Sequence, residues 1–444
     1  MTSKNSTPNR PELMIRYAPV ELLRPYPHNA RTHTQHQIRQ IAASIREFGF
    51  TNPVLIDRNN TIVAGHGRVE AAKILGMGAV PTVRLDQLSE EQVRAYVLAD
   101  NKLAENAGWD RSILAIELQH LLTLGDLDVT VTGFEVPEID LIMEEAAGRK
   151  DQDDELPAPE GPAVTSPGDL WQLGKHRILC GDSLEEQSFK TLIGAKRAAM
   201  VFSDPPYNVA IDGNVCGKGS VRHREFAMAA GEMSEVEFTA FLARVLRNLS
   251  RYSAAASLHF LCMDWRHMKE LLAAAGQVYD SLLNLCVWVK DNGGMGSLYR
   301  SRHELVFVYR NGKEVHRNNV QLGQFGRNRT NVWEYPGINT LSRNGEEGNL
   351  LALHPTVKPV QLVADAILDC SARGEIVLDG FLGSGSTLIA AERVGRICHG
   401  IEIDPLYVDV AIRRWQRQTG EMAIQASSKR CFNEIGEDKG AMHV

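Results

Sequence analysis

The feature that most constrains the fold is a glycine-rich turn, Asp379–Thr387, with the sequence DGFLGSGST. An apolar strand pattern at 376–378 precedes the turn and a helical pattern follows it. Gly383 and Gly385 have no Cβ, so a ligand can approach the backbone closely here. The next predicted strand leads to Glu402, about twenty positions past the glycines, where an acidic residue can hydrogen-bond ribose hydroxyls. The pattern therefore predicts a cofactor that contains a ribose.

Two common nucleotide-binding motifs do not fit this turn. A dinucleotide fingerprint, G-x-G-x-x-G, needs glycine at the position of Leu388. A P-loop needs Gly-Lys followed by Ser or Thr, and the turn has no such lysine. The dehydrogenase and kinase classes are therefore disfavoured.

Short apolar strand patterns alternate with helical patterns in the second half of the chain. This alternation predicts an α/β fold with an open, mostly parallel sheet covered on both faces. In such sheets, ligands lie beyond the carboxyl ends of the strands. The predicted strands are 198–202, 256–262, 283–290, 304–309, 376–378 and 397–401, and the predicted helices are 234–249, 266–275, 361–370 and 387–394.

A second motif, Asp204-Pro205-Pro206-Tyr207, follows the first of these strands. The exocyclic amine of adenine or cytosine is a poor nucleophile, because its lone pair is delocalised into the ring. Asp204 can accept one amine hydrogen and the carbonyl of Pro205 another, while Tyr207 can stack on the base. A base must leave the duplex to reach such a pocket. A simple turn is the alternative for this motif alone, but together the two motifs favour methyl transfer to an amino group in DNA.

Composition divides the chain into four parts. Residues 149–168 are rich in acid, proline and glycine and are predicted to be a flexible linker, because they cannot bury enough apolar surface to order themselves. Residues 1–148 have the patterns of a small α+β unit with trailing helices. Residues 169–420 contain both motifs, and the polar tail at 421–444 is expected to fray.

The composition is typical of a soluble globular protein, with 43% hydrophobic and 23% charged residues. The polar N-terminus lacks the apolar core of an export signal, and no apolar run approaches a membrane span, so a cytoplasmic location is expected. The seven cysteines have no C-x-x-C spacing. His28, His33 and His36 lack a carboxylate or cysteine to complete a set, so no metal site is predicted.

The formal net charge of −7 does not favour DNA binding, yet basic residues cluster between Lys290 and Arg329. Residues 292–353 are the preferred DNA-recognition region, and the basic stretch 211–224 is the other candidate. A solvated loop with scattered charge is the plain alternative. The predicted DNA contacts are Arg300, Arg302, Arg327 and Arg329.

From Asp169 to Thr419 the chain closely resembles the circularly permuted, beta-group DNA amino-methyltransferases, in which the catalytic motif precedes the cofactor motif. Besides the two motifs, the resemblance rests on 180–183, 354–359 and 400–402 and on Trp288, Lys290 and Glu304. It implies an S-adenosylmethionine-dependent, Rossmann-like methyltransferase fold with S-adenosyl-L-methionine as cofactor. The cofactor contacts that it implies are Asp182, Thr356, Lys358, Asp379, Phe381, Gly383, Gly385, Thr387 and Glu402.

Two positions depart from that family's pattern. Gly380 replaces the usual proline, and Val357 replaces the usual glutamine. Both flank the implied cofactor site, so they bear on affinity more than on activity. In this family an aspartate at the head of the catalytic motif usually accompanies adenine and a serine usually accompanies cytosine. Asp204 therefore favours adenine N6, with cytosine N4 as the alternative.

Residues 20–110 resemble the ParB/sulfiredoxin-like N-terminal domain, on the segments 23–31, 37–50 and 62–68. The resemblance implies a phosphate site at the start of a helix, where backbone N–H groups point outwards. Its residues would be Gly65, His66, Gly67 and Arg68. A simple turn fits nearly as well. His66 stands where sulfiredoxin chemistry needs a cysteine, so that activity is not expected.

The sequence thus predicts a site-specific DNA methyltransferase that moves a methyl group from S-adenosyl-L-methionine to adenine N6 in double-stranded DNA, with an appended ParB-like domain. Alternatives are cytosine N4 as the target, RNA as the substrate, and a ParB-like nucleotide-dependent DNA-binding protein whose methyltransferase fold only grips DNA. A homodimer is left open.

Overall fold

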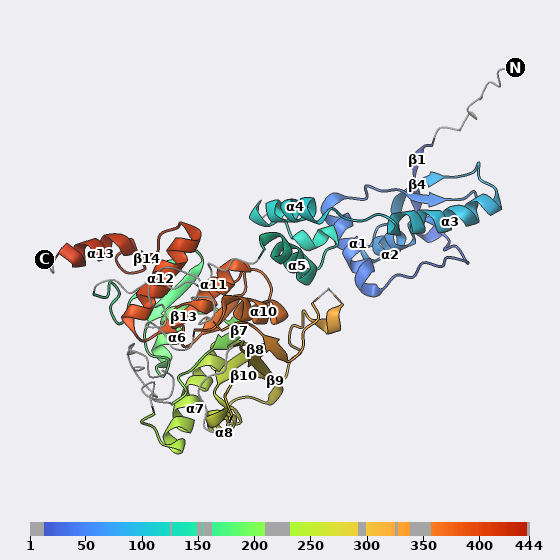
Figure 1. Ribbon diagram of the computed structural model, residues 1–444. Coiled ribbons are helices and arrows are strands. Elements are labelled where there is room, and N and C mark those ends of the chain that lie inside the picture. The colour runs from blue at the N-terminus through green and yellow to red at the C-terminus, as the bar shows by residue number, and fades with distance from the viewer. Residues whose placement is uncertain are drawn as a thin grey trace. The chain divides into compact units, whose positions relative to one another are not determined.

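The computed structural model describes residues 13–124, 127–148, 154, 162–208, 231–291, 299–324, 327–337 and 357–441. The chain forms two compact units, Met1–Ala146 and Ala147–Val444 (Figure 1). Across the described ranges, no helix combines the length and the apolar character needed to cross a membrane.

The first unit is a small α+β structure, as predicted. Its four-stranded sheet has the order β1-β4-β2-β3, and α1 and α2 pack against each other. Thr34 caps α1, because its side chain accepts a hydrogen bond from the backbone of Gln37, and Gly49 ends the helix with a positive φ of 79°. The elements are β1 (Ile15–Pro19), η1 (Val20–Leu22), α1 (Gln35–Phe48), β2 (Val54–Ile56), β3 (Ile62–Ala64), α2 (His66–Ile74), β4 (Ala79–Arg84), α3 (Glu90–Glu105), α4 (Arg111–Leu124), η2 (Val129–Thr132) and α5 (Val136–Ala147).

The second unit is built on a ten-stranded sheet with the order β11-β9-β10-β8-β7-β12-β13-β6-β5-β14. The five adjacent strands from β8 to β6 run parallel to one another, which confirms the predicted α/β class. The strands are β5 (Leu170–Leu173), β6 (His176–Cys180), β7 (Ala198–Ser203), β8 (Ser253–Met263), β9 (Ser281–Val289), β10 (His303–Arg310), β11 (Val332–Glu334), β12 (Ile376–Asp379), β13 (Ile397–Glu402) and β14 (Ile424–Gln425). The helices are α6 (Glu186–Ile193), α7 (Glu235–Arg251), η4 (Trp265–His267), α8 (Met268–Ala275), η5 (Gln321–Gly323), α10 (Val360–Cys370), α11 (Ser386–Arg393), α12 (Pro405–Thr419) and α13 (Phe432–Ala441).

Helices cover both faces of this sheet, because neighbouring residues of its central strands are both apolar. Val377 of β12 packs in a core with α10, α11 and α12, while Leu378 packs in a second core with α6, α7 and α8. Side chains alternate between the two faces of a strand, so continuous apolar strands require cover on each side. Figure 1 shows α7 and α8 on the opposite side of the central strands from α10 and α11.

The end of the predicted linker is packed on the second unit rather than flexible. Val164 is buried in the core, and the backbone N–H groups of Val164 and Thr165 donate to the buried carboxylate of Asp409 at 2.7 and 3.0 Å. The prediction of a linker up to residue 168 is therefore wrong at its C-terminal end. Composition could not indicate this contact, because Asp409 lies 245 residues from Val164.

The expectation that the tail at 421–444 frays is also wrong for its described residues, 421–441. β14 pairs with β5 and extends the sheet, and α13 follows. Phe432 is only 3% exposed and meets Trp171 edge to face, with the ring centroids 5.4 Å apart. The aromatic contact supplies the apolar burial that the polar composition of the tail seemed to lack.

Candidate active site

The two sequence motifs meet at the carboxyl edge of the parallel strands. β7 ends at Ser203, and its neighbour β12 ends at Asp379. The hydroxyl of Ser203 donates to Asp379 at 3.1 Å, and the backbone N–H of Gly380 donates to the Ser203 hydroxyl at 3.2 Å. The structure thus joins the motif headed by Asp204 to the glycine-rich turn through one buried serine. The sequence analysis did not single out Ser203.

Asp379 organises the glycine-rich turn from within. One carboxylate oxygen accepts from the N–H of Phe381 at 3.0 Å and the other from the hydroxyl of Thr387 at 2.7 Å. Burial raises the pKa of Asp379 to about 6, although these hydrogen bonds and the one from Ser203 oppose the shift. Gly385 has φ 88°, in the left-handed region that favours glycine. Asp379 and Thr387 therefore hold the turn in place.

Glu402 and Asp182 lie at the ends of the next two strands, β13 and β6. Glu402 accepts the N–H of Gly383 at 2.8 Å and that of Asp404 at 2.9 Å, and burial raises its pKa to about 7. Asp182 accepts the N–H of Leu184 at 2.8 Å and is half-buried. Carboxylates at neighbouring strand ends, beside a turn without side chains at its glycines, fit the ribose and adenine parts of a nucleoside cofactor. The predicted contact Thr356 lies outside the described residues.

Lys358 lies on the catalytic motif. Its ammonium forms a buried ion pair with Asp204 and a second one, at 3.0 Å, with Glu304 of β10. The hydroxyl of Tyr207 lies 2.5 Å from an oxygen of Asp204 and 3.1 Å from one of Glu304, so its single hydrogen can be donated to either carboxylate. Lys290, which directly follows β9, also forms an ion pair with Glu304. The resemblance implied a cofactor contact for Lys358, whereas the structure brings it to the acceptor group of the proposed chemistry.

Two carboxylates and two ammonium groups balance in the cluster of Asp204, Glu304, Lys290 and Lys358. The sequence analysis did not predict that these four residues meet. Burial raises the pKa of Asp204, while Lys358 lowers it and Glu304 raises it. Burial also acts to raise the pKa of Glu304, but Lys358 and Lys290 bring that pKa down to about 2. The sequence analysis names Glu304 among the residues that resemble the family but assigns it no role. A glutamate within the apolar strand His303–Arg310 is itself a signal, because buried carboxylates need partners.

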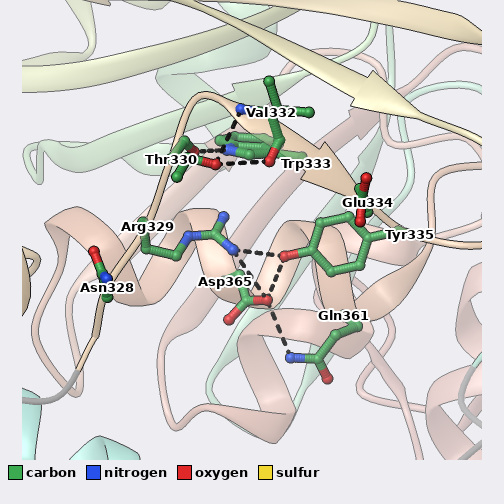
Figure 2. Close-up of a pocket in the computed structure, with 9 residues that line it drawn as sticks. All are labelled: Asn328, Arg329, Thr330, Val332, Trp333, Glu334, Tyr335, Gln361 and Asp365. Carbon is green, nitrogen blue, oxygen red and sulfur yellow. Dashed lines mark hydrogen bonds and ion pairs between the residues drawn. The ribbon is translucent and has the colours of Figure 1, made fainter.

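A pocket of about 280 Å³ lies between α10 and residues 328–335, which belong to the predicted recognition region (Figure 2). Figure 2 shows the side chains of Arg329, Tyr335 and Gln361 directed toward Asp365. The hydroxyl of Tyr335 donates to Asp365 at 2.5 Å and accepts from Arg329 at 2.7 Å. The residues that line the pocket are Asn328, Arg329, Thr330, Val332, Trp333, Glu334, Tyr335, Gln361 and Asp365.

Two of the four arginines expected to contact DNA are held by the protein itself. Arg327 is buried and pairs with Asp365 at 3.1 Å and Asp369 at 2.9 Å. Arg329 donates to Asp369 at 3.2 Å and lies 5.1 Å from the centroid of the Trp333 ring. These contacts argue against phosphate binding by either side chain, because both guanidinium groups are already paired with carboxylates. The sequence shows the charge of an arginine but not its partner. Arg300 and Arg302 are exposed and stay predicted DNA contacts.

The predicted phosphate turn of the first unit, residues 65–68, lies at the start of α2. Gly65 has φ 101°, and the Arg68 side chain folds over it while donating to the carbonyl of Asn52 at 2.9 Å. His66 accepts the N–H of Tyr26 at 3.1 Å, and burial lowers its pKa. Both side chains thus have a local structural role, and phosphate binding at this turn stays a prediction.

The fold and the joined motifs agree with the methyltransferase class that the sequence predicts. Comparison with family models places the chain more narrowly: a DNA methylase family of N6/N4 enzymes matches residues 198–413, a ParB N-terminal domain matches 4–102, and a ParB-methyltransferase HTH domain matches 112–167. Residues 198–413 thus form a domain of the N6/N4 DNA methylase family, with ParB-like and HTH domains ahead of it. The HTH domain was missed in the sequence analysis, which described its region only as trailing helices and a linker.

Individual relatives match separate parts of the chain. The ParB-like nuclease domain-containing protein YnaK of Escherichia coli K12 is 53% identical over 81 residues, which are 18% of this chain and 93% of that protein. The type II methyltransferase M.HpaI of Haemophilus parainfluenzae is 34% identical over 113 residues, 25% of this chain and 34% of that protein. The matched part is thus about a third of that methyltransferase. The crystal structure of an M1.HpyAVI–SAM complex is 17% identical with a TM-score of 0.37, and covers 54% of this chain and 98% of that one. The match to the DNA methylase family over residues 198–413 supports the predicted cofactor, S-adenosylmethionine.

Proposed function

We propose that this protein transfers a methyl group from S-adenosylmethionine to adenine N6 at specific sites in double-stranded DNA. The observation that carries the proposal is the link from Ser203 to Asp379, which sets the acceptor carboxylate of Asp204 next to the turn that fits the cofactor. Cytosine N4 is the alternative target, because Asp204 can accept hydrogens from either amine. The proposal includes a cytoplasmic location and leaves the oligomeric state open.

The residues of the chain position the nucleophile. S-adenosylmethionine, when bound, supplies an electrophilic methyl group on a sulfonium sulfur. Asp204 and the carbonyl of Pro205 accept the two amine hydrogens, which favours a tetrahedral nitrogen with its lone pair directed at the methyl carbon. The side chain of Asp204 is only 20% exposed, so its charge acts in a site of low dielectric constant. Asp204 can then take the proton that the methylated amine loses.

The direct test is methyl transfer from labelled S-adenosylmethionine to mixed-sequence duplex DNA, with nucleosides of the product identified by mass spectrometry. We expect N6-methyladenine. N4-methylcytosine would replace the adenine assignment with the alternative. Label found only when RNA is supplied, or none at all despite bound cofactor, would reject the proposed function.

We also propose that the pocket beside β11 contacts bases of the recognition sequence. Asn328, Thr330 and Glu334 are exposed at the pocket, and their amide, hydroxyl and carboxylate groups are of the kinds that read base edges. Beneath them Arg329 and Asp365 form a fixed, paired floor. A rigid floor under exposed polar side chains supports selection between bases.

Glu334→Ala is expected to relax sequence selection at one base pair, by about 1–3 kcal/mol or 5- to 150-fold in preference. Sequencing of methylated positions in a random DNA library measures this preference. Glu314→Ala removes an exposed glutamate outside the pocket and serves as the matched control. An identical site preference for both variants would contradict the role of the pocket.

A further inference from the structure

We infer that Lys358 is a positioning residue of the methyl-transfer site, which holds Asp204 ionised and aligned until the amine of the target base takes its place. Glu304, which already contacts the ammonium group, remains its charged partner when the base enters. The inference rests on the proposed methyl transfer and deepens it, because it assigns a step of substrate entry to residues outside the two motifs.

Lys358 is enclosed by acceptors. Its side chain is 4% exposed, and its ammonium contacts the Asp204 carboxylate, the Glu304 carboxylate at 3.0 Å and the hydroxyl of Tyr207 at 3.1 Å. An ammonium has three hydrogens, so these three partners match its donor capacity. The residue directly precedes Pro359, which caps α10. A lysine this deeply buried needs its partners, because an unpaired charge there is costly.

The cluster has alternating charges. Lys290 pairs with Glu304, Glu304 pairs with Lys358, and Lys358 pairs with Asp204. Two ammonium groups therefore balance two carboxylates. Removing Lys358 leaves excess negative charge around Asp204, and removing Glu304 leaves excess positive charge. These two changes have opposite effects on the proton affinity of the same carboxylate.

Both oxygens of Asp204 are occupied in this structure. Oδ2 accepts from Lys358 and Oδ1 from Tyr207. An incoming amine must displace one of these donors in order to give its hydrogen to Asp204. Displacement of Lys358 leaves its ammonium with Glu304, so the lysine keeps a charged partner. The exchange also moves a positive charge away from the amine nitrogen, on which positive charge develops during transfer.

The groups facing Asp204 determine the sign of the pH effect. They are Lys358 before α10, Glu304 on β10, Tyr207 on its own loop, Cys262 on β8 and Asp379 on β12. Burial raises the pKa of Asp204, Lys358 lowers it, and Glu304 raises it. Loss of Lys358 therefore raises the pKa further and leaves more of the carboxyl protonated at neutral pH. A protonated carboxyl is a weaker acceptor, so activity is lost at the acid side of the pH profile.

The test compares pH profiles of kcat for the full-length Lys358→Met and Glu304→Gln variants. Lys358→Met is expected to move the acid limb to higher pH by about one unit or more, with a loss of kcat below the limb that recovers as the pH is raised. Glu304→Gln is expected to move the acid limb to lower pH. Lys313→Met removes an exposed ammonium elsewhere and should leave the limb in place.

A second readout does not depend on activity. Selective ¹³C labelling of aspartate carboxyl groups, with Asp204→Asn to assign the signal, gives the pKa of Asp204 by NMR. We expect the order Lys358→Met above wild type above Glu304→Gln. A pH-independent loss of activity together with an unchanged Asp204 pKa would overturn the inference and leave Lys358 a purely structural role. The expected NMR order in a protein that methylates neither DNA nor RNA would instead reject the proposed function.

Discussion

Asp204→Ala is expected to lower the rate of methyl transfer by about a thousandfold, because the target amine loses its charged acceptor. Binding of S-adenosylmethionine should stay close to that of the wild type, since Ser203 rather than Asp204 contacts the glycine-rich turn. Single-turnover transfer to DNA and calorimetric titration of the cofactor measure the two quantities separately.

The control for this variant is Asp280→Ala, which removes an exposed carboxylate outside the site. Asp204→Asn keeps the shape of the side chain and one oxygen that can accept from Lys358, but it removes the negative charge. It therefore separates loss of the charge from loss of the side chain. Transfer by Asp204→Ala within tenfold of the wild-type rate would remove Asp204 from the chemistry. If Asp204→Ala and Asp204→Asn both lose cofactor binding, the motif headed by Asp204 instead supports the glycine-rich turn.

Gly385→Ala is expected to destabilise the second unit by about 2–4 kcal/mol and to weaken cofactor binding. The added Cβ would lie 2.9 Å from the Cβ of Ala411 on α12, and the residue would keep φ 88°. A steric clash and an unfavourable backbone conformation therefore act at the same position. Denaturant unfolding gives the free-energy change, and titration with S-adenosylmethionine gives the affinity.

Gly374→Ala separates these two causes. Gly374 has a similar φ of 77°, but a Cβ built there meets nothing within 4 Å. We expect a cost of about 1 kcal/mol from the backbone alone, with unchanged cofactor affinity. Equal destabilisation by the two variants would show that packing against Ala411 does not fix the turn.

The sequence predicted those parts of the site whose signals are local. The central strands are continuous apolar runs, the two motifs follow strand ends, and the glycines at 383 and 385 reveal a turn. Parallel strands then bring their carboxyl ends together without further information. For this reason the α/β class and the approximate position of Asp204, Asp379 and Glu402 could be derived before the structure.

Contacts between distant segments could not be derived in this way. Lys358 and Asp204 are 154 residues apart, and nothing in the sequence of either segment names the other as its partner. The basic residues Arg327 and Arg329 looked available for phosphate, because a sequence shows charge but not the carboxylates that neutralise it. Resemblance to a family identified Lys358, and only the structure shows its contact with the acceptor.

Helix α10 belongs to both the pocket and the catalytic cluster. Asp365 and Asp369 on this helix hold Arg327 and Arg329, and Lys358 lies just before its first residue. Replacement of residues 327–337 by the segment of another methylase would remove Arg327 and Arg329 and leave these two aspartates without their arginine partners. Exchange of specificity between such enzymes should therefore succeed when residues 327–337 and α10 are moved as one block, and fail when the segment is moved alone.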